Sequence, residues 1–243
     1  MKIAVLGSGA WGTALGLVLS KNGHAVTLWG HRAENLRAME ERRMNDLHLP
    51  GIPLPEWRYA SDLADAAAEA PVVVVAIPSS AFRGIIRQLG EYRGLMVSVT
   101  KGIEYDSGLA MSGVMRECAP GAAVAALSGP TLAMEVAKGF PSAIVAAGEN
   151  REVAERVQKL FHRPSFRVYT STDLLGVELA GALKNVIAIA AGVGDGLGFG
   201  DNSKAALVTR AIAEIRRLGV ACGAQAETFS GLSGLGDLTV TCF

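Results

Sequence analysis

The sequence predicts an α/β fold, in which a doubly wound, mostly parallel sheet is followed by an all-helical second domain. Apolar strand-like runs alternate with helix-length segments up to Thr170, and this alternation is typical of parallel sheets with helices on both faces. Beyond Thr170, the segments 173–193 and 202–218 are long, rich in alanine and leucine, and free of strand alternation. We therefore expect two domains, 1–170 and 171–243.

Each expected strand is a short apolar run bounded by polar or glycine-containing segments. The runs are 2–6, 25–29, 72–76, 96–100, 123–127, 142–146 and 167–169. The glycine-rich stretch 192–200 is expected to join the two long helices as a flexible loop, and a phosphate-binding nest is the alternative.

Composition limits the classes of partner. The chain has 243 residues, half of them apolar, which is enough for a sizeable core. Its 23 basic and 23 acidic side chains cancel, so no global field attracts nucleic acid or anionic lipid, and an anionic substrate must be met by local charge. Three cysteines and four histidines without metal-ligand spacing indicate a reducing compartment and no metal site.

The N-terminal segment 3–20 is uncharged and could be mistaken for a targeting or membrane segment. Three glycines interrupt it, and no small-residue cleavage site follows it. We found no other uninterrupted apolar stretch of about 18 residues. The sequence therefore predicts an unprocessed cytoplasmic chain without a membrane span.

The first expected strand runs into the pattern G-x-G-x-x-G, written here as Gly7-Ser8-Gly9-Ala10-Trp11-Gly12, before an apolar helix. In this pattern Gly7 permits the tight turn, Gly9 lets the backbone approach a pyrophosphate, and Gly12 lets helix and strand close. The phosphates then lie at the helix N-terminus, where free N–H groups and the helix dipole favour anions. The segment predicts a Rossmann-type dinucleotide-binding domain.

The residues after the second strand bear on the choice of cofactor. Where an acidic residue would bind the ribose 2′-hydroxyl of NAD, the chain has Gly30-His31-Arg32. A guanidinium at Arg32 suits a 2′-phosphate, so NADPH is favoured. The alternatives are a solvated Arg32 without a cofactor contact, and a role for Glu34 that keeps NADH possible.

Two further segments follow expected strands and can face a ligand. Lys101 lies at the carboxyl edge of the sheet, where ligands of such folds collect, although this feature taken alone favours an exposed strand-end lysine. The segment 128–131 contains Gly129 and Pro130, a rigid turn that can pack against cofactor or substrate or serve only as a structural turn.

The helical half offers two more candidates. Lys184 shares a helix face with small residues, namely Ala180, Gly181, Ala188 and Ala191. A lysine on such a face is expected to be buried or to line a cleft, which lowers its pKa and suits it to acid–base work; the alternative is a lysine that snorkels to the helix end. Asp237 follows several glycines and can orient a lysine or a substrate hydroxyl, or act as a helix N-cap.

Taken together, these motifs resemble the bacterial-type NAD(P)-dependent glycerol-3-phosphate dehydrogenase family. The matching segments are 7–12, 29–32, 100–102, 128–131, 178–186, 202–210 and 234–242. The resemblance implies reversible reduction of dihydroxyacetone phosphate to sn-glycerol 3-phosphate for glycerophospholipid synthesis, with NADPH as cofactor and NADH possible. It also implies a homodimer and a helical domain like the C-terminal domain of 6-phosphogluconate dehydrogenase.

The resemblance also implies roles for individual residues. It makes Lys184 the proton donor and acceptor, with Asn185 and Thr241 polarising or holding the reacting oxygens and Lys101 and Asp237 completing the catalytic group. The implied substrate contacts are Lys101, Gly129, Thr131, Lys184, Asp237 and Thr241. The implied cofactor contacts are Gly7, Ser8, Gly9, Ala10, Trp11, Gly12, His31, Arg32, Lys101 and Ala133.

The chain departs from the family at its C-terminal end. The family continues into a serine-arginine-asparagine motif whose arginine contacts the substrate phosphate and the cofactor, whereas this sequence ends at Phe243. We expect a fragment, or a phosphate site weakened by about 2 to 5 kcal/mol. Two alternatives remain: a related hydroxyacid or ketopantoate-type reductase, and a non-catalytic dinucleotide-binding sensor or inactive truncated paralogue.

Overall fold

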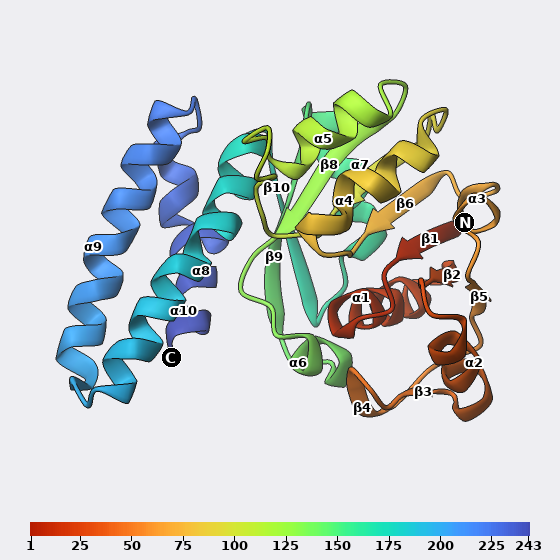
Figure 1. Ribbon diagram of the computed structural model, residues 1–243, viewed down its shortest axis with the longest axis horizontal. Coiled ribbons are helices and arrows are strands. Elements are labelled where there is room, and N and C mark those ends of the chain that lie inside the picture. The colour runs from red at the N-terminus through yellow and green to blue at the C-terminus, as the bar shows by residue number, and fades with distance from the viewer.

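The computed structural model describes residues 1–243, which fold into a sheet half and a helical half (Figure 1). The elements of the sheet half are β1 (Lys2–Leu6), α1 (Ala10–Lys21), β2 (Ala25–Trp29), α2 (Ala33–Arg42), β3 (Met44–Asn45), β4 (Leu49–Pro53), β5 (Arg58–Ala60), α3 (Leu63–Ala67), β6 (Val72–Val75), α4 (Ser79–Ile86), η1 (Arg87–Leu89), β7 (Leu95–Ser98), α5 (Met111–Cys118), β8 (Ala123–Ser128), α6 (Ala133–Lys138), β9 (Ser142–Gly148), α7 (Arg151–Phe161) and β10 (Phe166–Ser171). Those of the helical half are α8 (Leu174–Gly196), α9 (Gly200–Ala221), η2 (Ala226–Ser230), η3 (Leu232–Gly236) and α10 (Asp237–Cys242).

The main sheet has eight strands in the order β10-β9-β8-β7-β6-β1-β2-β5. Every neighbouring pair is parallel except β8 and β9, so the prediction of a mostly parallel, doubly wound sheet is confirmed. The order reverses at β1, which lies between β2 and β6. In folds of this kind ligands bind at the carboxyl ends of the strands beside this switch point.

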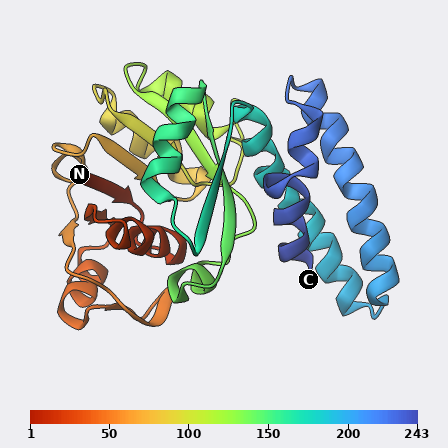
Figure 2. The same cartoon turned by 180° about the vertical axis from the view of Figure 1, so that it is seen from behind.

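Helices cover both faces of the sheet (Figures 1 and 2). Along β1, Ile3 and Val5 pack in the core beneath α1, α6 and α7, whereas Ala4 and Leu6 pack in the core with α3, α4, α5 and the start of α8. Because both faces are buried, the central strands are almost continuously apolar, as in the four buried valines of β6. The apolar runs of the sequence therefore predicted these strands to within one or two residues.

Three strands were not predicted. β3 and β4 form an antiparallel pair outside the main sheet, and β5 adds a parallel edge strand beside β2. β3 and β5 are short, β4 contains two prolines, and none shows a clear alternation of apolar and polar residues. Periodicity carries little signal in such segments.

The predicted loop at 192–200 is wrong for most of its length. Helix α8 continues to Gly196, and the connection to α9 is only 197–199. Glycine costs about 1 kcal/mol relative to alanine inside a helix but does not forbid one, and the helical hydrogen bonds continue to the N–H of Leu197. Only Gly198 and Gly200, with φ of +73° and +74°, need the conformational freedom of glycine.

The helical half has small cores of its own. The ring of Phe229 is buried against α9 at Gly219, where a Cβ atom would lie 1.9 Å from the ring. One side of α8 is exposed: Val186, Ile189 and Val193 on this helix are 66%, 70% and 57% accessible.

Helix α8 is also long and apolar enough to cross a membrane. Half of its most apolar 18-residue stretch is buried within the molecule, so the helix is only a weak indication of a membrane span.

Candidate active site

Three charged side chains from distant parts of the sequence meet at the junction of the two halves. Lys101 follows β7, Lys184 lies in α8, and Asp237 is the first residue of α10. The Nζ atom of Lys184 is 2.5 Å from Oδ1 of Asp237, and the Nζ atom of Lys101 contacts Oδ2 of the same carboxylate. We call these three residues the lysine–aspartate cluster.

The cluster is buried and carries excess positive charge. The side chains of Asp237, Lys184 and Lys101 are 1%, 10% and 24% exposed. Two ammonium groups share one carboxylate, which leaves one positive charge in excess when both lysines are protonated. In a site with little water, such a charge favours an anionic ligand or a developing alkoxide.

Burial lowers the pKa of Lys101 to about 8. The negative charge of Asp237 opposes this shift, and the neighbouring ammonium of Lys184 adds to it. Lys101 therefore exchanges its proton in the neutral to mildly alkaline range.

Glycines bring Asp237 to this position. The preceding π-helical turn η3 packs closely on its surroundings, and a Cβ atom at Gly234 would lie 2.2 Å from the carbonyl oxygen of Phe229. Ser233 donates a hydrogen bond of 3.4 Å to the carbonyl of Ser128 at the end of β8. The interpretation of Asp237 as an N-cap is wrong, because Gly236 is the N-cap and the Asp237 carboxylate binds the lysines instead.

Thr241 lies one turn beyond Asp237 and extends the cluster. Its Oγ1 accepts a hydrogen bond of 2.7 Å from Lys184, and its hydroxyl donates one of 2.6 Å to the backbone carbonyl of Asp237. Lys184 is therefore held between Asp237 and Thr241. The alternative of a lysine that snorkels to the helix end is wrong, because Lys184 is buried.

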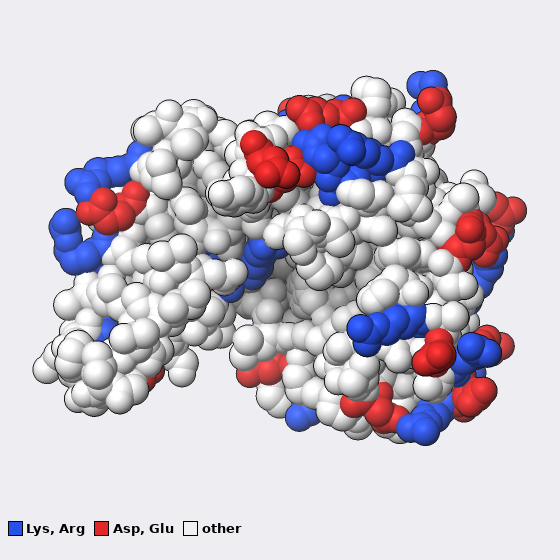
Figure 3. Space-filling view, viewed as in Figure 1, with Lys and Arg blue, Asp and Glu red and all other residues white.

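The turn after β8 also reaches the cluster. The carbonyl oxygen of Gly129 accepts hydrogen bonds from Nζ of Lys101 at 3.4 Å and from the hydroxyl of Thr131 at 3.2 Å. The structure thus places Gly129 and Thr131 beside Lys101. In Figure 3, Lys or Arg atoms are visible at the bottom of the solvent-exposed hollow between the two halves.

A cavity of about 470 Å³ lies at the switch point of the sheet. Its lining residues come from the end of β2 and the segments that follow β1, β2 and β6, from the starts of α1 and α2, and from the hairpin β3–β4. They are Gly7, Ser8, Gly9, Ala10, Trp11, Gly12, Trp29, Gly30, His31, Arg32, Asn35, His48, Ala76, Ile77 and Pro78. The glycine loop, His31 and Arg32 therefore share one cavity, which we call the dinucleotide pocket.

The glycine geometry fits the roles expected for a pyrophosphate loop. Gly7 has φ of +122°, which other residues rarely adopt, and a Cβ atom at Gly12 would lie 2.0 Å from the carbonyl oxygen of Gly7. A Cβ atom at Gly9 would meet nothing within 4 Å, so the space above it is open. No side chain caps the N-terminus of α1, which leaves its first N–H groups to a ligand.

The dinucleotide pocket and the lysine–aspartate cluster are neighbours. Thr100 precedes Lys101, and its hydroxyl donates a hydrogen bond of 2.7 Å to the carbonyl of Ile77, which lines the pocket. Gly102 packs against Ser79, where a Cβ atom would lie 2.7 Å from the serine Cβ. A dinucleotide in the pocket would thus lie next to the charged cluster.

Two of the predicted site residues, Asn185 and Ala133, lie apart from these groups. Asn185 is exposed and makes no side-chain hydrogen bond. Ala133 begins α6 and packs against the core, and neither it nor Lys101 lines the dinucleotide pocket. Arg32 lines the pocket but has no acidic partner.

Sequence reasoning missed two polar pairs outside the cluster and the dinucleotide pocket. The buried carboxylate of Glu178 accepts hydrogen bonds from the backbone N–H of Ser112 at 2.8 Å and from its hydroxyl at 2.5 Å, and burial raises the pKa of Glu178. Arg83 binds Glu104 through two bonds of 2.7 and 2.6 Å, which lowers the pKa of Glu104 to about 2. The sequence did contain one signal for Glu178, because it is a charged residue within an otherwise apolar helical segment.

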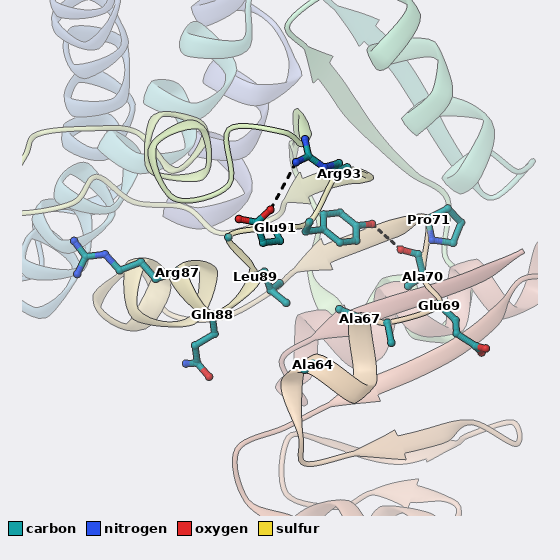
Figure 4. Close-up of a pocket in the computed structure, with 13 residues that line it drawn as sticks. Ala64, Ala67, Glu69, Ala70, Pro71, Arg87, Gln88, Leu89, Glu91 and Arg93 are labelled. Atoms are coloured by element: carbon teal, nitrogen blue, oxygen red, sulfur yellow. Dashed lines mark hydrogen bonds and ion pairs between the residues drawn. The ribbon is translucent and has the colours of Figure 1, made fainter.

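The largest surface depression, about 830 Å³, lies elsewhere (Figure 4). Pro71, which directly precedes β6, and Arg93, which lies two residues before β7, both line it, so it lies at the amino ends of these strands. Tyr92 donates a hydrogen bond to the carbonyl of Ala70 within it, and Glu91 pairs with Arg93. The depression is shallow and on the opposite edge of the sheet from the cluster.

No group of three His, Cys, Asp or Glu side chains that could hold a metal is present anywhere in the molecule.

The fold and the glycine loop define a Rossmann-type dinucleotide-binding protein with a charged cluster beside its pocket. The family profile described as the N-terminus of NAD-dependent glycerol-3-phosphate dehydrogenase matches residues 2–154, and the profile of its C-terminus matches residues 173–243. The chain belongs to the NAD-dependent glycerol-3-phosphate dehydrogenase family.

Individual relatives agree with this assignment. A glycerol-3-phosphate dehydrogenase [NAD(P)+] of Halorhodospira halophila is 51% identical over 99% of this chain and 73% of its own length. One of Syntrophotalea carbinolica is 49% identical over 100% of this chain and 75% of its own. The crystal structure of the Coxiella burnetii glycerol-3-phosphate dehydrogenase is 37% identical with a TM-score of 0.95, over 100% of this chain and 75% of that one.

Proposed function

We propose that this chain is an NAD(P)-dependent oxidoreductase that reversibly reduces dihydroxyacetone phosphate to sn-glycerol 3-phosphate. The observation that carries the proposal is the buried lysine–aspartate cluster beside the dinucleotide pocket, in a chain of this family. The excess positive charge of the cluster suits a substrate that brings a phosphate and becomes an alkoxide. The names of the close relatives support the same reaction.

In this mechanism the bound nicotinamide cofactor supplies the hydride, and the chain supplies position, charge and a proton. Lys184, held by Asp237 and Thr241, donates its proton to the alkoxide oxygen and takes it back in the reverse direction. Lys101 and the turn at Gly129 and Thr131 bind the substrate. Holding these groups before the reaction begins lowers the cost of stabilising the negative charge as it develops.

The roles of two outlying residues belong to the same proposal. Asn185 is placed next to Lys184 on α8 and is exposed, so it can turn toward a bound substrate to hold a reacting oxygen. Ala133 begins α6, close to the turn at 129–131, and would meet the cofactor from that side.

We infer NADPH as the favoured cofactor and NADH as an accepted one. Arg32 and His31 line the pocket, and no acidic side chain lines it. A guanidinium without an acidic partner can pair with the 2′-phosphate of NADPH. The glycine loop would bind the pyrophosphate, which NADPH and NADH have in common.

The remaining features of the proposal concern organisation. We propose a boundary between a cofactor domain, 1–170, and a helical substrate domain, 171–243, which falls before Ser171, the last residue of β10. We also propose a homodimer in the cytoplasm. Support comes from the exposed apolar side of α8 at Val186, Ile189 and Val193, since an apolar stripe of this kind is typical of a protein interface.

The test is the oxidation of NADPH, followed at 340 nm with dihydroxyacetone phosphate, in the wild type and in Lys184→Ala. We expect kcat to fall about 10² to 10⁴-fold, because the proton and the charge act in the transition state, while the Kd for NADPH stays unchanged. Lys138→Ala, an exposed lysine on α6, is the matched control.

The assay is run in parallel on a chain extended beyond Phe243 by the corresponding segment of the Halorhodospira halophila relative. Equal turnover in wild type and Lys184→Ala would refute the role of Lys184. NADPH binding without any turnover in either chain would instead favour a non-catalytic dinucleotide-binding protein.

A further inference from the structure

The hairpin β3–β4 lies at the edge of the dinucleotide pocket, outside the main sheet. Its base is closed by two hydrogen bonds, from the N–H of Leu54 to the carbonyl of Arg43 at 2.8 Å and from Nε of Arg43 to the carbonyl of Leu54 at 3.2 Å. Leu49 and Leu54 are buried in the core beneath α1. The base of the hairpin is therefore fixed, and its tip projects toward the pocket.

The tip forms part of the pocket wall. His48 lines the dinucleotide pocket. A second cavity of about 200 Å³ is lined by Ser8, Asn35 and His48, together with further residues of α2 and the hairpin residues 44–47. These three residues are common to both cavities, so they form the wall between the two. This wall lies on the side of the pocket that holds His31 and Arg32, where the adenosine half of the cofactor would bind.

One buried side chain joins the tip to the glycine loop. The carboxamide of Asn45 is 2% exposed. It donates hydrogen bonds to the backbone carbonyl of Ser8 at 2.9 Å and to Oγ1 of Thr13 at 2.8 Å, and it accepts one of 3.2 Å from the N–H of His48. Both of its N–H groups and its oxygen are thus used, each on a different element: the glycine loop, helix α1 and the hairpin tip.

We propose that Asn45 is a positioning residue for the adenosine half of NADPH, an inference that rests on the proposed function. Ser8 is the second residue of the loop that faces the pyrophosphate, and its peptide orientation is fixed through its carbonyl by Asn45. The same carboxamide holds the backbone of His48 at the pocket wall. Without it, the loop and the wall lose their common anchor, and dinucleotide binding weakens.

The chain offers a matched control in Asn22. This residue caps the other end of α1, and its carboxamide donates two hydrogen bonds, to the carbonyls of Leu160 at 2.8 Å and His162 at 3.3 Å. Its replacement removes equivalent bonds on the same helix, away from the pocket. A loss of cofactor binding that follows only from a less stable α1 would therefore occur in both variants.

The experiment measures the Kd of NADPH by fluorescence titration and the Kd of ADP-ribose by calorimetry, together with Tm. The variants are Asn45→Ala and the isosteric Asn45→Asp, which keeps the acceptor for His48 and loses the donor to Ser8. We expect both Kd values to rise tenfold or more, equivalent to about 1.4 kcal/mol. At saturating NADPH we expect kcat to stay within about threefold, and Asn22→Ala to lower Tm without changing either Kd.

The outcomes separate the inference from the proposed function. A folded Asn45→Asp chain with the wild-type Kd for NADPH, or an Asn22→Ala chain with the same rise in Kd, would overturn the inference alone. If the Asn45 variants do not fold, Thr13→Val removes one acceptor of the carboxamide, and an unchanged Kd there would also overturn it. A wild-type chain that binds neither probe would overturn both.

Discussion

Replacing Asp237 by asparagine tests whether one carboxylate holds the two lysines of the cluster together. The substitution keeps the shape of the side chain but leaves Lys101 and Lys184 facing each other without their shared anion. Breaking a buried ion pair from one side typically costs 3 to 5 kcal/mol. Because Lys101 is 24% exposed and can turn toward water, we expect the lower end, about 3 kcal/mol at pH 7.

The pH dependence of this loss follows from the pKa of Lys101. In the wild type this pKa is about 8 rather than the ordinary 10.5, and Asp237 is the group that raises it. Without Asp237 it falls further. Between the folded and unfolded pKa values the unfolded chain binds more protons, so the free energy of unfolding rises with pH in both proteins. This rise in the free energy of unfolding begins at a lower pH in Asp237→Asn. The difference in the free energy of unfolding between wild type and Asp237→Asn therefore narrows by about 1 kcal/mol between pH 7 and pH 9.

The assay is urea unfolding of wild type and Asp237→Asn at pH 7 and pH 9, with Asp106→Asn as an exposed control that should stay within about 0.5 kcal/mol of wild type. Comparing the two proteins cancels the titrating groups that lie away from the cluster. A loss below about 1 kcal/mol at pH 7, or a gap that does not narrow at pH 9, would refute the reasoning about the shared carboxylate.

Two further predictions concern the glycine loop and the start of α8. Gly12→Ala should lower stability by about 1 to 3 kcal/mol and abolish NADPH binding, because its Cβ would lie 2.0 Å from the carbonyl of Gly7. Gly9→Ala should weaken binding without loss of Tm, since its Cβ meets no protein atom; equal Tm losses in both variants would contradict this. Because burial raises the pKa of Glu178, the folded chain takes up this proton before the unfolded one, and wild type should gain stability over Glu178→Gln as the pH falls from 7 toward 4.5. Urea unfolding across this range checks it, and a constant difference would count against it.

The central strands and the glycine loop could be predicted because their signals are local. A buried parallel strand is almost continuously apolar, and the G-x-G-x-x-G spacing encodes its own turn, so no distant residue is needed to recognise either. The hairpin at 44–53 escaped prediction because its short strands lack periodicity and its register depends on anchors elsewhere. Asn45, its most connected residue, has no sequence pattern that marks its bonds to Ser8 and Thr13.

The cluster could be predicted in part. The small residues around Lys184 indicated burial, which the structure confirms. They could not indicate that the pKa of Lys101 is lowered to about 8. That shift depends on how completely its ammonium is desolvated and on the nearby charges of Asp237 and Lys184, and both are set by tertiary packing. For Asp237, helical capping statistics favoured an N-cap, but the attraction of two buried ammonium groups outweighs one exposed capping bond.

The position of Lys184 depends on how firmly α8 is held at its start, several residues earlier. Asp173 caps the helix through the N–H of Gly176 at 3.0 Å, and its other oxygen accepts bonds from the N–H of Gln225 at 2.9 Å and the hydroxyl of Thr228 at 2.5 Å. This carboxylate therefore ties α8 to η2, the segment that leads through η3 to Asp237. Asp173 thereby links the helix that carries Lys184 to the segment that leads to Asp237, and supporting contacts of this kind are what a preorganised charged site requires.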